Sequence, residues 1–290
     1  MHSASVDQRL ADIAACQWGM ITTAQARVHG VARANLAHRV RLGTLARTDH
    51  YGVYRLAATP TSHLDDLRAA WLSTNPEALA PDRTQAPKPD VVVASAAAAV
   101  VHGMGDVYPA PYLMIVPSRR QSTREGIAYS WRVLDSRDVE VLDGLPVTTR
   151  ERTVVDLLAD EGDVSIAADA LRDALRDAYD LDETRLAALL APHAKRLGQA
   201  SGDGVNAVAH LMVTAGADAV SDASRALDRV LRSESRLPGI EAFIAKVVKS
   251  VPALAATIPL ETSHAERTRR SAPAAPILES PSAGSSGRQA

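Results

Sequence analysis

Cysteine, lysine and aromatic residues are scarce in this chain of 290 residues. The single cysteine, Cys16, excludes an internal disulfide and any metal cluster built on cysteine. Only four lysines accompany 28 arginines, so one arginine by itself is weak support for a function. No signal peptide is apparent, and alanine-rich runs such as Ala96–Val101 are too short to cross a bilayer. We therefore expect a cytoplasmic protein with no membrane partner.

Charge is distributed unevenly along the sequence. Residues 1–58 contain seven arginines and three acidic residues, which gives this segment a net charge of +4. The other residues contain 25 basic and 31 acidic side chains, so the net charge of −2 for the whole chain hides a basic N-terminal segment. A local excess of arginine is the electrostatic footprint expected of a segment that contacts phosphate groups.

The same basic segment has the residue pattern of a winged helix-turn-helix. Three helices are predicted, over Val6–Trp18, Ala24–His29 and Ala32–Leu42, and a glycine follows each of them. Thr22 or Thr23 can cap the second helix. Two β-prone runs within Leu45–Leu56 then predict a hairpin, the wing. In a module of this kind the third helix enters the major groove of DNA.

Side chains of the third predicted helix and the wing are the candidates for DNA contact. Arg33 and Asn35 lie near the helix start, where such helices read bases, and they can pair with guanine and adenine respectively. Arg39, Arg41 and the wing residue Arg47 are expected to contact phosphates. The alternative is an ordinary amphipathic helix with a solvated, arginine-rich face. The full set of predicted DNA-binding residues is Thr22, Thr23, Arg33, Asn35, His38, Arg39, Arg41 and Arg47.

The sequence as a whole predicts an α+β fold with a helical C-terminal part. Ser62 can cap a connecting helix over His63–Thr74, and the proline-rich segment Asn75–Asp90 is predicted as a linker or surface loop. A mixed α/β section follows, with strands near 91–93, 112–116, 128–133, 139–142 and 145–148 and a helix over 95–102. From residue 150 the pattern is helical, with further helices near 164–178, 182–191, 203–214, 219–232 and 238–250. The predicted domains are 1–58 (winged helix-turn-helix), 59–90 (connecting helix and linker), 91–262 (α/β and helical domain) and 263–290 (disordered tail).

Polar clusters outside the basic segment favour structural roles. Arg152 and Asp156 are four residues apart, the ordinary spacing of an ion pair on a helix. His102 precedes a glycine at a predicted helix end, where a helix cap is the simpler interpretation. The basic loop Arg119–Arg124 could contact DNA or a partner, although a solvated surface is the simpler interpretation.

Several stretches together resemble the AbiEi-type antitoxins. Gly19–Leu56 is similar to their N-terminal domain, with a Thr-Thr helix start, a basic third helix, and Gly-x-Leu and Gly-Val-Tyr in the wing. Val92–Met104 and Val116–Arg120 are similar to two later blocks, and GLPVTTRERTVVDLLA (Gly144–Ala159) is the most specific match. The resemblance covers roughly residues 7–175 and is loose beyond them.

This resemblance implies a DNA-binding autorepressor and antitoxin with no catalytic activity. Such proteins are encoded beside a nucleotidyltransferase-like toxin. Their winged helix represses their own promoter, and their C-terminal domain counters the toxin. The implied partners are double-stranded DNA from that promoter and the cognate toxin, and no cofactor or metal is implied. A palindromic operator would imply a dimer on the DNA, because half-site symmetry mirrors protein symmetry.

Two other interpretations remain open from the sequence: an endonuclease-related protein that acts on DNA, and a regulator unrelated to any toxin. A nuclease of this type needs acidic metal ligands with a lysine nearby on a strand, and the sequence contains no Glu-x-Lys string. The toxin's own chemistry needs a Gly-Ser turn and paired aspartates on a strand. Here Gly284-Ser285 falls in the predicted tail and Asp65-Asp66 on a predicted helix. We therefore expect a protein that is not an enzyme.

Overall fold

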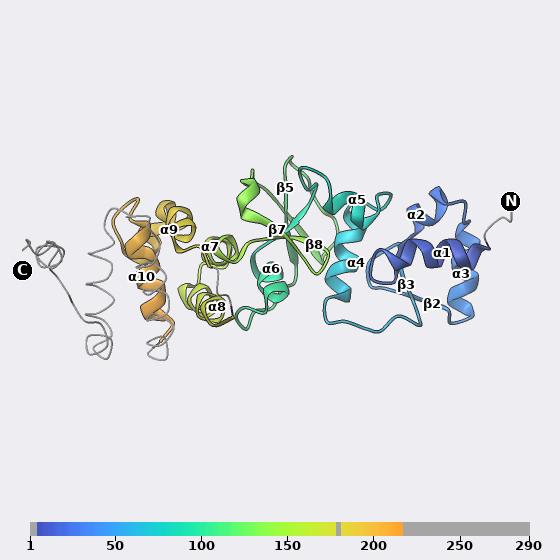
Figure 1. Cartoon of the computed structure of the whole chain (residues 1–290), viewed down its shortest axis with the longest axis horizontal. Helices are drawn as coiled ribbons and strands as arrows, with labels where there is room; N and C mark the ends of the chain where they lie inside the picture. The colour runs from blue at the N-terminus through green and yellow to red at the C-terminus, as the bar shows by residue number, and fades with distance from the viewer. Residues whose placement is uncertain (1–4, 178–180, 217–290) are drawn as a thin grey trace, which may run out of the picture.

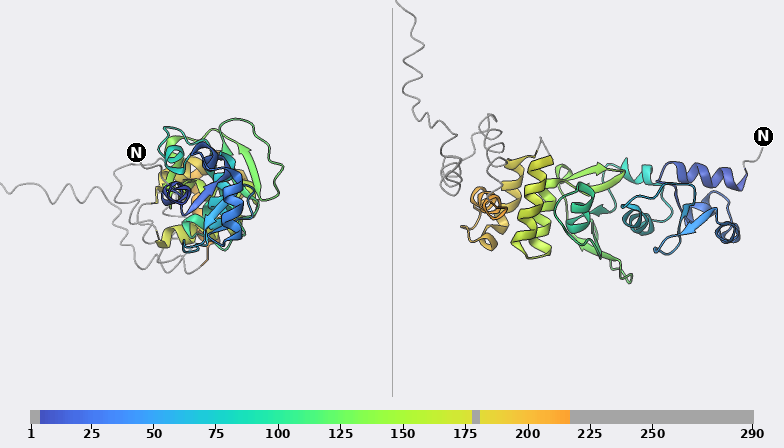
Figure 2. Two further views of the ribbon diagram at one scale, coloured as in Figure 1. Left: turned by 90° about the vertical axis from the view of Figure 1, so that its right-hand side faces the viewer. Right: turned by 90° about the horizontal axis from the view of Figure 1, so that it is seen from below.

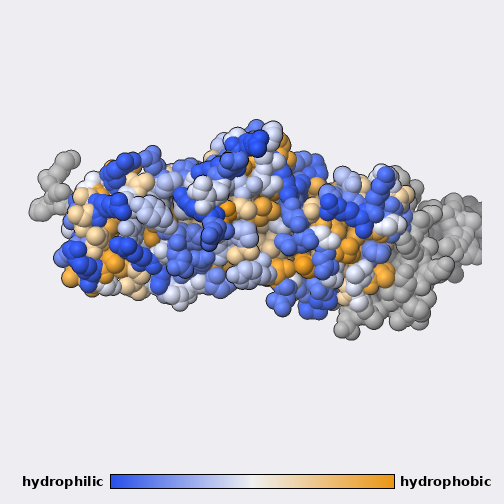
Figure 3. All heavy atoms as spheres, turned by 180° about the vertical axis from the view of Figure 1, so that it is seen from behind, coloured by the Kyte–Doolittle hydropathy of each residue, from blue (hydrophilic) through white to orange (hydrophobic). Residues whose placement is uncertain are grey.

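The protein is elongated, and successive segments of the chain follow one another along its long axis (Figure 1). The computed structural model describes residues 5–177 and 181–216. The right-hand view of Figure 2 shows the same order, with the N-terminal helices at one end and the last described helices at the other, and the left-hand view looks along the long axis. Seen from the side opposite to Figure 1, hydrophilic residues cover most of the surface and hydrophobic residues show in scattered patches (Figure 3).

Residues 5–58 form an N-terminal module of three helices and a small sheet. The helices are α1 (Val6–Ala15), α2 (Thr23–Val28) and α3 (Arg33–Arg41). The antiparallel strands β1 (Met20–Thr22), β3 (Val53–Leu56) and β2 (Leu45–Arg47) lie in that order. The core of the module includes Leu10, Ile13, Ile21, Leu36 and Leu45. The predicted winged helix-turn-helix is therefore confirmed as a fold.

Two details of this module differ from the prediction. The first helix ends at Ala15, not at Trp18, because Trp18 and Gly19 take positive φ angles of 57° and 74° and turn the chain back. Strand β1 was not predicted. Its three residues are all buried, so they lack the polar–apolar alternation that reveals a strand at a surface.

The connecting segment is packed and partly helical. Helix α4 (Asp65–Thr74) begins two residues later than predicted, and the Asp65 carboxylate accepts a bond from the Ser62 amide (3.1 Å). The predicted linker contains helix α5 (Ala80–Thr84), whose Arg83 guanidinium lies 3.4 Å from the ring centre of Trp71. Arg83 is buried and donates to the carbonyl of Trp71 (2.9 Å). The proline-rich segment is therefore held against α4 and is not an open loop.

A five-stranded mixed sheet occupies the middle of the molecule. Its order is β6 (Ile127–Trp131), β5 (Tyr112–Val116), β4 (Val92–Val93), β8 (Leu145–Thr148) and β7 (Val139–Leu142). The pairs β5–β6 and β4–β8 are parallel, and the other two are antiparallel. Helix α6 (Ser95–His102) follows β4, and α7 (Arg150–Asp160) follows β8. The predictions for β5, β7, β8 and α6 are confirmed to the residue, whereas β6 begins and ends slightly earlier than predicted.

Helices form the far end of the described chain. They are α8 (Val164–Asp177), α9 (Glu183–Leu190) and α10 (Gly204–Thr214), with a 3-10 segment at Ala191–Leu197 between the last two. They share one apolar core with α7. Another 3-10 segment, Ser136–Asp138, directly precedes β7. The helices predicted near 219–232 and 238–250, and the tail predicted from 263, lie outside the described residues. None of the described helices is both long and apolar enough to cross a bilayer.

The N-terminal module and the following part of the chain, which we call the body (residues 65–177 and 181–216), share a hydrophobic core. Met20 of β1 and Val53 of β3 belong to the same buried cluster as Leu67 and Trp71 of α4. The Trp18 ring meets the Trp71 ring edge to face, with centroids 6.2 Å apart. The module is therefore packed directly on the body.

Candidate nucleic-acid interface

Helix α3 lies at the end of the molecule remote from the five-stranded sheet (Figure 1). Leu36 is fully buried and fixes the inner side of the helix, whereas Arg33, His38 and Arg41 are exposed. Asn35 is partly buried at the edge of this outer face. The outer face thus carries four of the eight predicted residues and can reach a ligand as large as a duplex.

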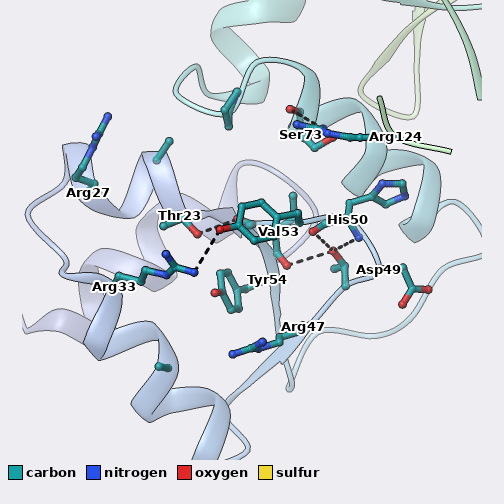
Figure 4. Close-up of a pocket in the computed structure, with 16 residues that line it drawn as sticks. Thr23, Arg27, Arg33, Arg47, Asp49, His50, Val53, Tyr54, Ser73 and Arg124 are labelled. Carbon is teal, nitrogen blue, oxygen red and sulfur yellow. Dashed lines mark hydrogen bonds between the residues drawn. The ribbon is translucent and has the colours of Figure 1, made fainter. Parts of the chain in front are cut away.

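A groove lies between α3, the wing and the body (Figure 4). Its volume is about 600 Å³. Four arginines line it: Arg27 of α2, Arg33 of α3, Arg47 of the wing, and Arg124 of the body. Asp49 is the one carboxylate among the described residues that line it. Arg27 is paired with Glu77 (2.6 Å), but the other three arginines still outnumber Asp49, so the groove is suited to a polyanion.

Hydrogen bonds within the wing fix the shape of its turn, residues 48–52. The His50 amide donates to the Thr48 hydroxyl (3.3 Å), and the Val53 amide donates to the carbonyl of His50 (3.1 Å). Tyr51 is 79% exposed at this turn, and its hydroxyl accepts a bond from Arg33 (3.3 Å). Tyr51 was missed from the sequence. An aromatic residue inside a polar wing turn was the available signal.

The two threonines predicted as DNA contacts have structural roles. Thr22 is 1% exposed, caps α2 by accepting from the Gln25 amide (3.0 Å), and donates its hydroxyl to the carbonyl of Pro76. The Gln25 side chain accepts from the Thr22 amide in return, which completes a capping box. Thr23 lines the groove, but its hydroxyl donates to the carbonyl of Gly52 (3.2 Å). Because its side chain is covered, Thr22 is not placed to make the predicted DNA contact.

Arg39 also bonds to residues within the N-terminal module. Its side chain is 13% exposed, and its Nε atom lies 2.6 Å from a carboxylate oxygen of Asp7 on α1. It also donates to the carbonyl of Asn35 (3.2 Å). The hydrogen bond from Arg39 lowers the pKa of Asp7. Arg39 therefore ties α3 to α1, which opposes its predicted role as a phosphate contact.

The basic loop between β5 and β6 is anchored to the end of α4. Arg124 donates to the carbonyl of Ser73 (3.2 Å) and to its hydroxyl (2.5 Å). Arg120 donates to the carbonyl of Thr74 (2.5 Å) and lies 5.0 Å from the ring centre of Tyr129. These contacts place Arg124 at the groove beside the N-terminal module, which its position in the sequence did not indicate.

Two family models match the chain, one on each side of the connecting segment. Residues 8–57 match the model described as "Transcriptional regulator, AbiEi antitoxin", and residues 91–203 match "AbiEi antitoxin C-terminal domain". Together the two matches span more than half of the chain. The chain belongs to the AbiEi antitoxin family. It is therefore related to antitoxins that act as transcriptional regulators, as the sequence resemblance implied.

Similarity to individual proteins is weaker. The crystal structure of RV2827C protein from Mycobacterium tuberculosis aligns with a TM-score of 0.43 and 17% sequence identity, covering 81% of this chain and 84% of that chain. This similarity is too low to support an inference about function. No curated protein matches the chain.

The block with the most specific AbiEi resemblance forms β8 and α7 and contains a buried ion-pair cluster. Asp156 is 1% exposed and lies 2.9 Å from Arg152 and 2.8 Å from Arg132. Burial raises the pKa of Asp156 to about 6, although both arginines oppose this shift. Because Arg132 follows β6, the cluster joins the sheet to α7. It is a structural ion pair, as expected.

His102 is enclosed at the end of α6. Its Nε2 atom lies 2.7 Å from the carbonyl of Thr148, and burial lowers the pKa of the imidazole. The C-cap of α6 is Gly103, in the left-handed conformation. The predicted cap is thus supplied by the glycine, and His102 bonds to β8. Within the described residues, no group of three or more His, Cys, Asp or Glu is placed to hold a metal ion.

Proposed function

We propose that this AbiEi family member binds double-stranded DNA through α3 and the wing and represses its own promoter. The observation that carries the proposal is the groove lined by four arginines beside an exposed recognition helix. A duplex is a rod of regularly spaced phosphates, so arginines on two flanking elements can hold it on both sides of the major groove. The description of the N-terminal family model as a transcriptional regulator supports the same role.

Different side chains have different tasks in this proposal. Arg33 and Asn35, at the start of α3, read base edges, because arginine and asparagine match guanine and adenine. Arg41 and Arg47 contact phosphates, which position the protein without reading sequence. His38 lies on the same exposed face and adds a contact to the duplex.

We further propose that the body counters a co-encoded nucleotidyltransferase-like toxin without catalysis, in the cytoplasm. Support comes from family membership, since residues 91–203 match the AbiEi antitoxin C-terminal domain. Charge also supports a protein ligand for the body, because its residues include 22 acidic and 15 basic side chains. A negative surface is repelled by nucleic acid and suits a protein partner.

DNA binding is tested by fluorescence anisotropy with the full chain and a labelled duplex from upstream of its own gene. Arg33→Ala should weaken binding by about 1–3 kcal/mol and relax the preference at one base position. Arg47→Ala should weaken all sequences alike and lower the salt slope by about one unit. Arg176→Ala is the matched control, since this half-exposed arginine lies on α8, far from the groove. Equal losses in all three variants would contradict the proposal.

Antitoxin action is tested separately, by co-expression with the neighbouring toxin from a promoter that ignores autoregulation. The full chain with Arg33, Asn35 and Arg41 changed to alanine should lose repression and keep protection. If this variant is folded and equally abundant but fails to protect, protection depends on DNA binding and the proposed division of labour is wrong.

A further inference from the structure

The wing turn is held from two sides, and only one of them belongs to the N-terminal module. On the inner side, the amide of Thr23 donates to the carbonyl of Gly52 (2.8 Å). On the outer side, the His50 side chain points away from the module and lies against Asp66 and Tyr112 of the body. In Figure 4 the His50 ring is turned away from the side chains of Arg33 and Arg47.

The His50 ring contacts the carboxylate of Asp66 on α4. The Nε2 atom of His50 lies 3.3 Å from one carboxylate oxygen of Asp66, and the His50 side chain is 10% exposed. This contact has the length of an ion pair but does not meet hydrogen-bond geometry, and Nε2 has no hydrogen-bond partner among the described residues. The Asp66 carboxylate is therefore placed to compensate for the burial of this nitrogen.

Tyr112, at the start of β5, orients the Asp66 carboxylate. Its hydroxyl donates to the second carboxylate oxygen of Asp66 (2.8 Å), and its ring centre lies 6.4 Å from that of His50. Burial and the bond to Asp66 raise the pKa of Tyr112, so the phenol keeps its proton and acts as the donor. Gly126 of the body also lies close to the ring, since a Cβ added there would lie 3.6 Å from the Cε1 atom of His50.

From these contacts we infer that Asp66 and Tyr112 position the wing through His50, so that DNA affinity depends on two residues outside the N-terminal module. This inference rests on the proposed DNA-binding function. Arg47 directly precedes the anchored turn, Tyr51 lies within it, and both line the groove with Arg33. A wing that is free to move must be ordered again when DNA binds, and the lost conformational entropy weakens binding. Asp66 and Tyr112 are positioning residues and need not touch DNA.

The test uses the full chain and compares three substitutions. Asp66→Leu removes both acceptor oxygens and keeps the branched shape of the side chain, and Tyr112→Phe removes only the donor that orients the carboxylate. Asp66→Asn keeps an oxygen for Tyr112 and an amide that can face His50. Asp82→Leu, at an exposed aspartate of α5, is the matched control.

Two measurements are made on each variant: affinity for the promoter duplex, and hydrogen–deuterium exchange of residues 48–53. Asp66→Leu should bind DNA about three- to tenfold more weakly, because it removes the hydrogen bond from Tyr112 and the polar contact with His50. Its wing amides should exchange faster than in the wild type. Tyr112→Phe should show a smaller change of the same kind, and Asp66→Asn and Asp82→Leu should resemble the wild type.

Each outcome bears on one claim. Unchanged exchange in Asp66→Leu overturns the anchoring of the wing. Faster exchange with unchanged affinity overturns the positioning role, because the wing would then be ordered by something else. If the wild-type chain itself does not bind DNA, the proposed function fails, and the exchange measurement still decides whether Asp66 holds the wing.

Discussion

Replacing Trp18 by alanine should weaken the junction between the N-terminal module and the body. The half-buried indole packs edge to face on Trp71 and donates to the carbonyl of Asp143 (3.0 Å). The Arg68 guanidinium lies 5.1 Å from its ring centre. Loss of a fully buried tryptophan costs about 3–5 kcal/mol. Because Trp18 is half-buried, we expect a loss of about 2–3 kcal/mol in the free energy of unfolding.

Urea unfolding followed by circular dichroism measures this loss, since fluorescence would change with the removed indole itself. Trp131→Ala is the matched control, because Trp131 is 64% exposed at the end of β6 and should lose no more than about 0.5 kcal/mol. If Trp18→Ala unfolds at the wild-type urea midpoint, or if both variants lose the same stability, the junction contributes nothing and the reasoning fails.

Three further substitutions test other features. Thr22→Ala removes the cap of α2 and should cost about 1 kcal/mol of stability in thermal melts, whereas Thr61→Ala, at an exposed threonine, should cost almost nothing. Binding selection should show the same base preference in both variants. The pKa of Asp156 in the folded protein is about 6, above its ordinary value, so the charged carboxylate destabilises the fold above that pH. The free energy of unfolding of the wild type should therefore rise relative to that of Asp156→Asn as the pH falls from about 6.5 to 4.5, and an equal pH dependence in both proteins would contradict this. Gly144→Ala and Gly103→Ala both introduce a side chain at a positive φ, but only Gly144→Ala would place a Cβ 2.8 Å from the Trp18 indole. Thermal melts should therefore show a larger loss of stability for Gly144→Ala.

Elements with a regular pattern could be predicted from the sequence, whereas those fixed by distant contacts could not. The strand over Tyr112–Val116 and the helix over Ser95–His102 are confirmed because a buried strand and an alanine-rich helix each have a local signature. The helix over Ala80–Thr84 was missed. Its segment is rich in proline, and its order depends on Arg83 stacking on Trp71, a contact that composition does not encode.

In the candidate site, too, the features with a local sequence pattern could be predicted and those fixed by distant contacts could not. Exposure of His38 and Arg41 follows from helical periodicity, because Leu36 fixes the buried side of the helix. The partners that remove Thr22 and Arg39 from the interface lie in the connecting segment and on the first helix. Neither partner is a helical neighbour of the residue it engages, so only the folded chain reveals that these two side chains are already occupied.

The core shared by the N-terminal module and α4 limits how this protein could be re-engineered. A chimeric repressor made by grafting residues 1–58 onto a foreign body would expose Met20 and Val53, which are buried against α4 here. It would also lose the carbonyls of Pro76 and Ala78, which accept bonds from α2 and its cap. A transferable cassette should therefore extend to about residue 90 and carry α4 and α5 with it.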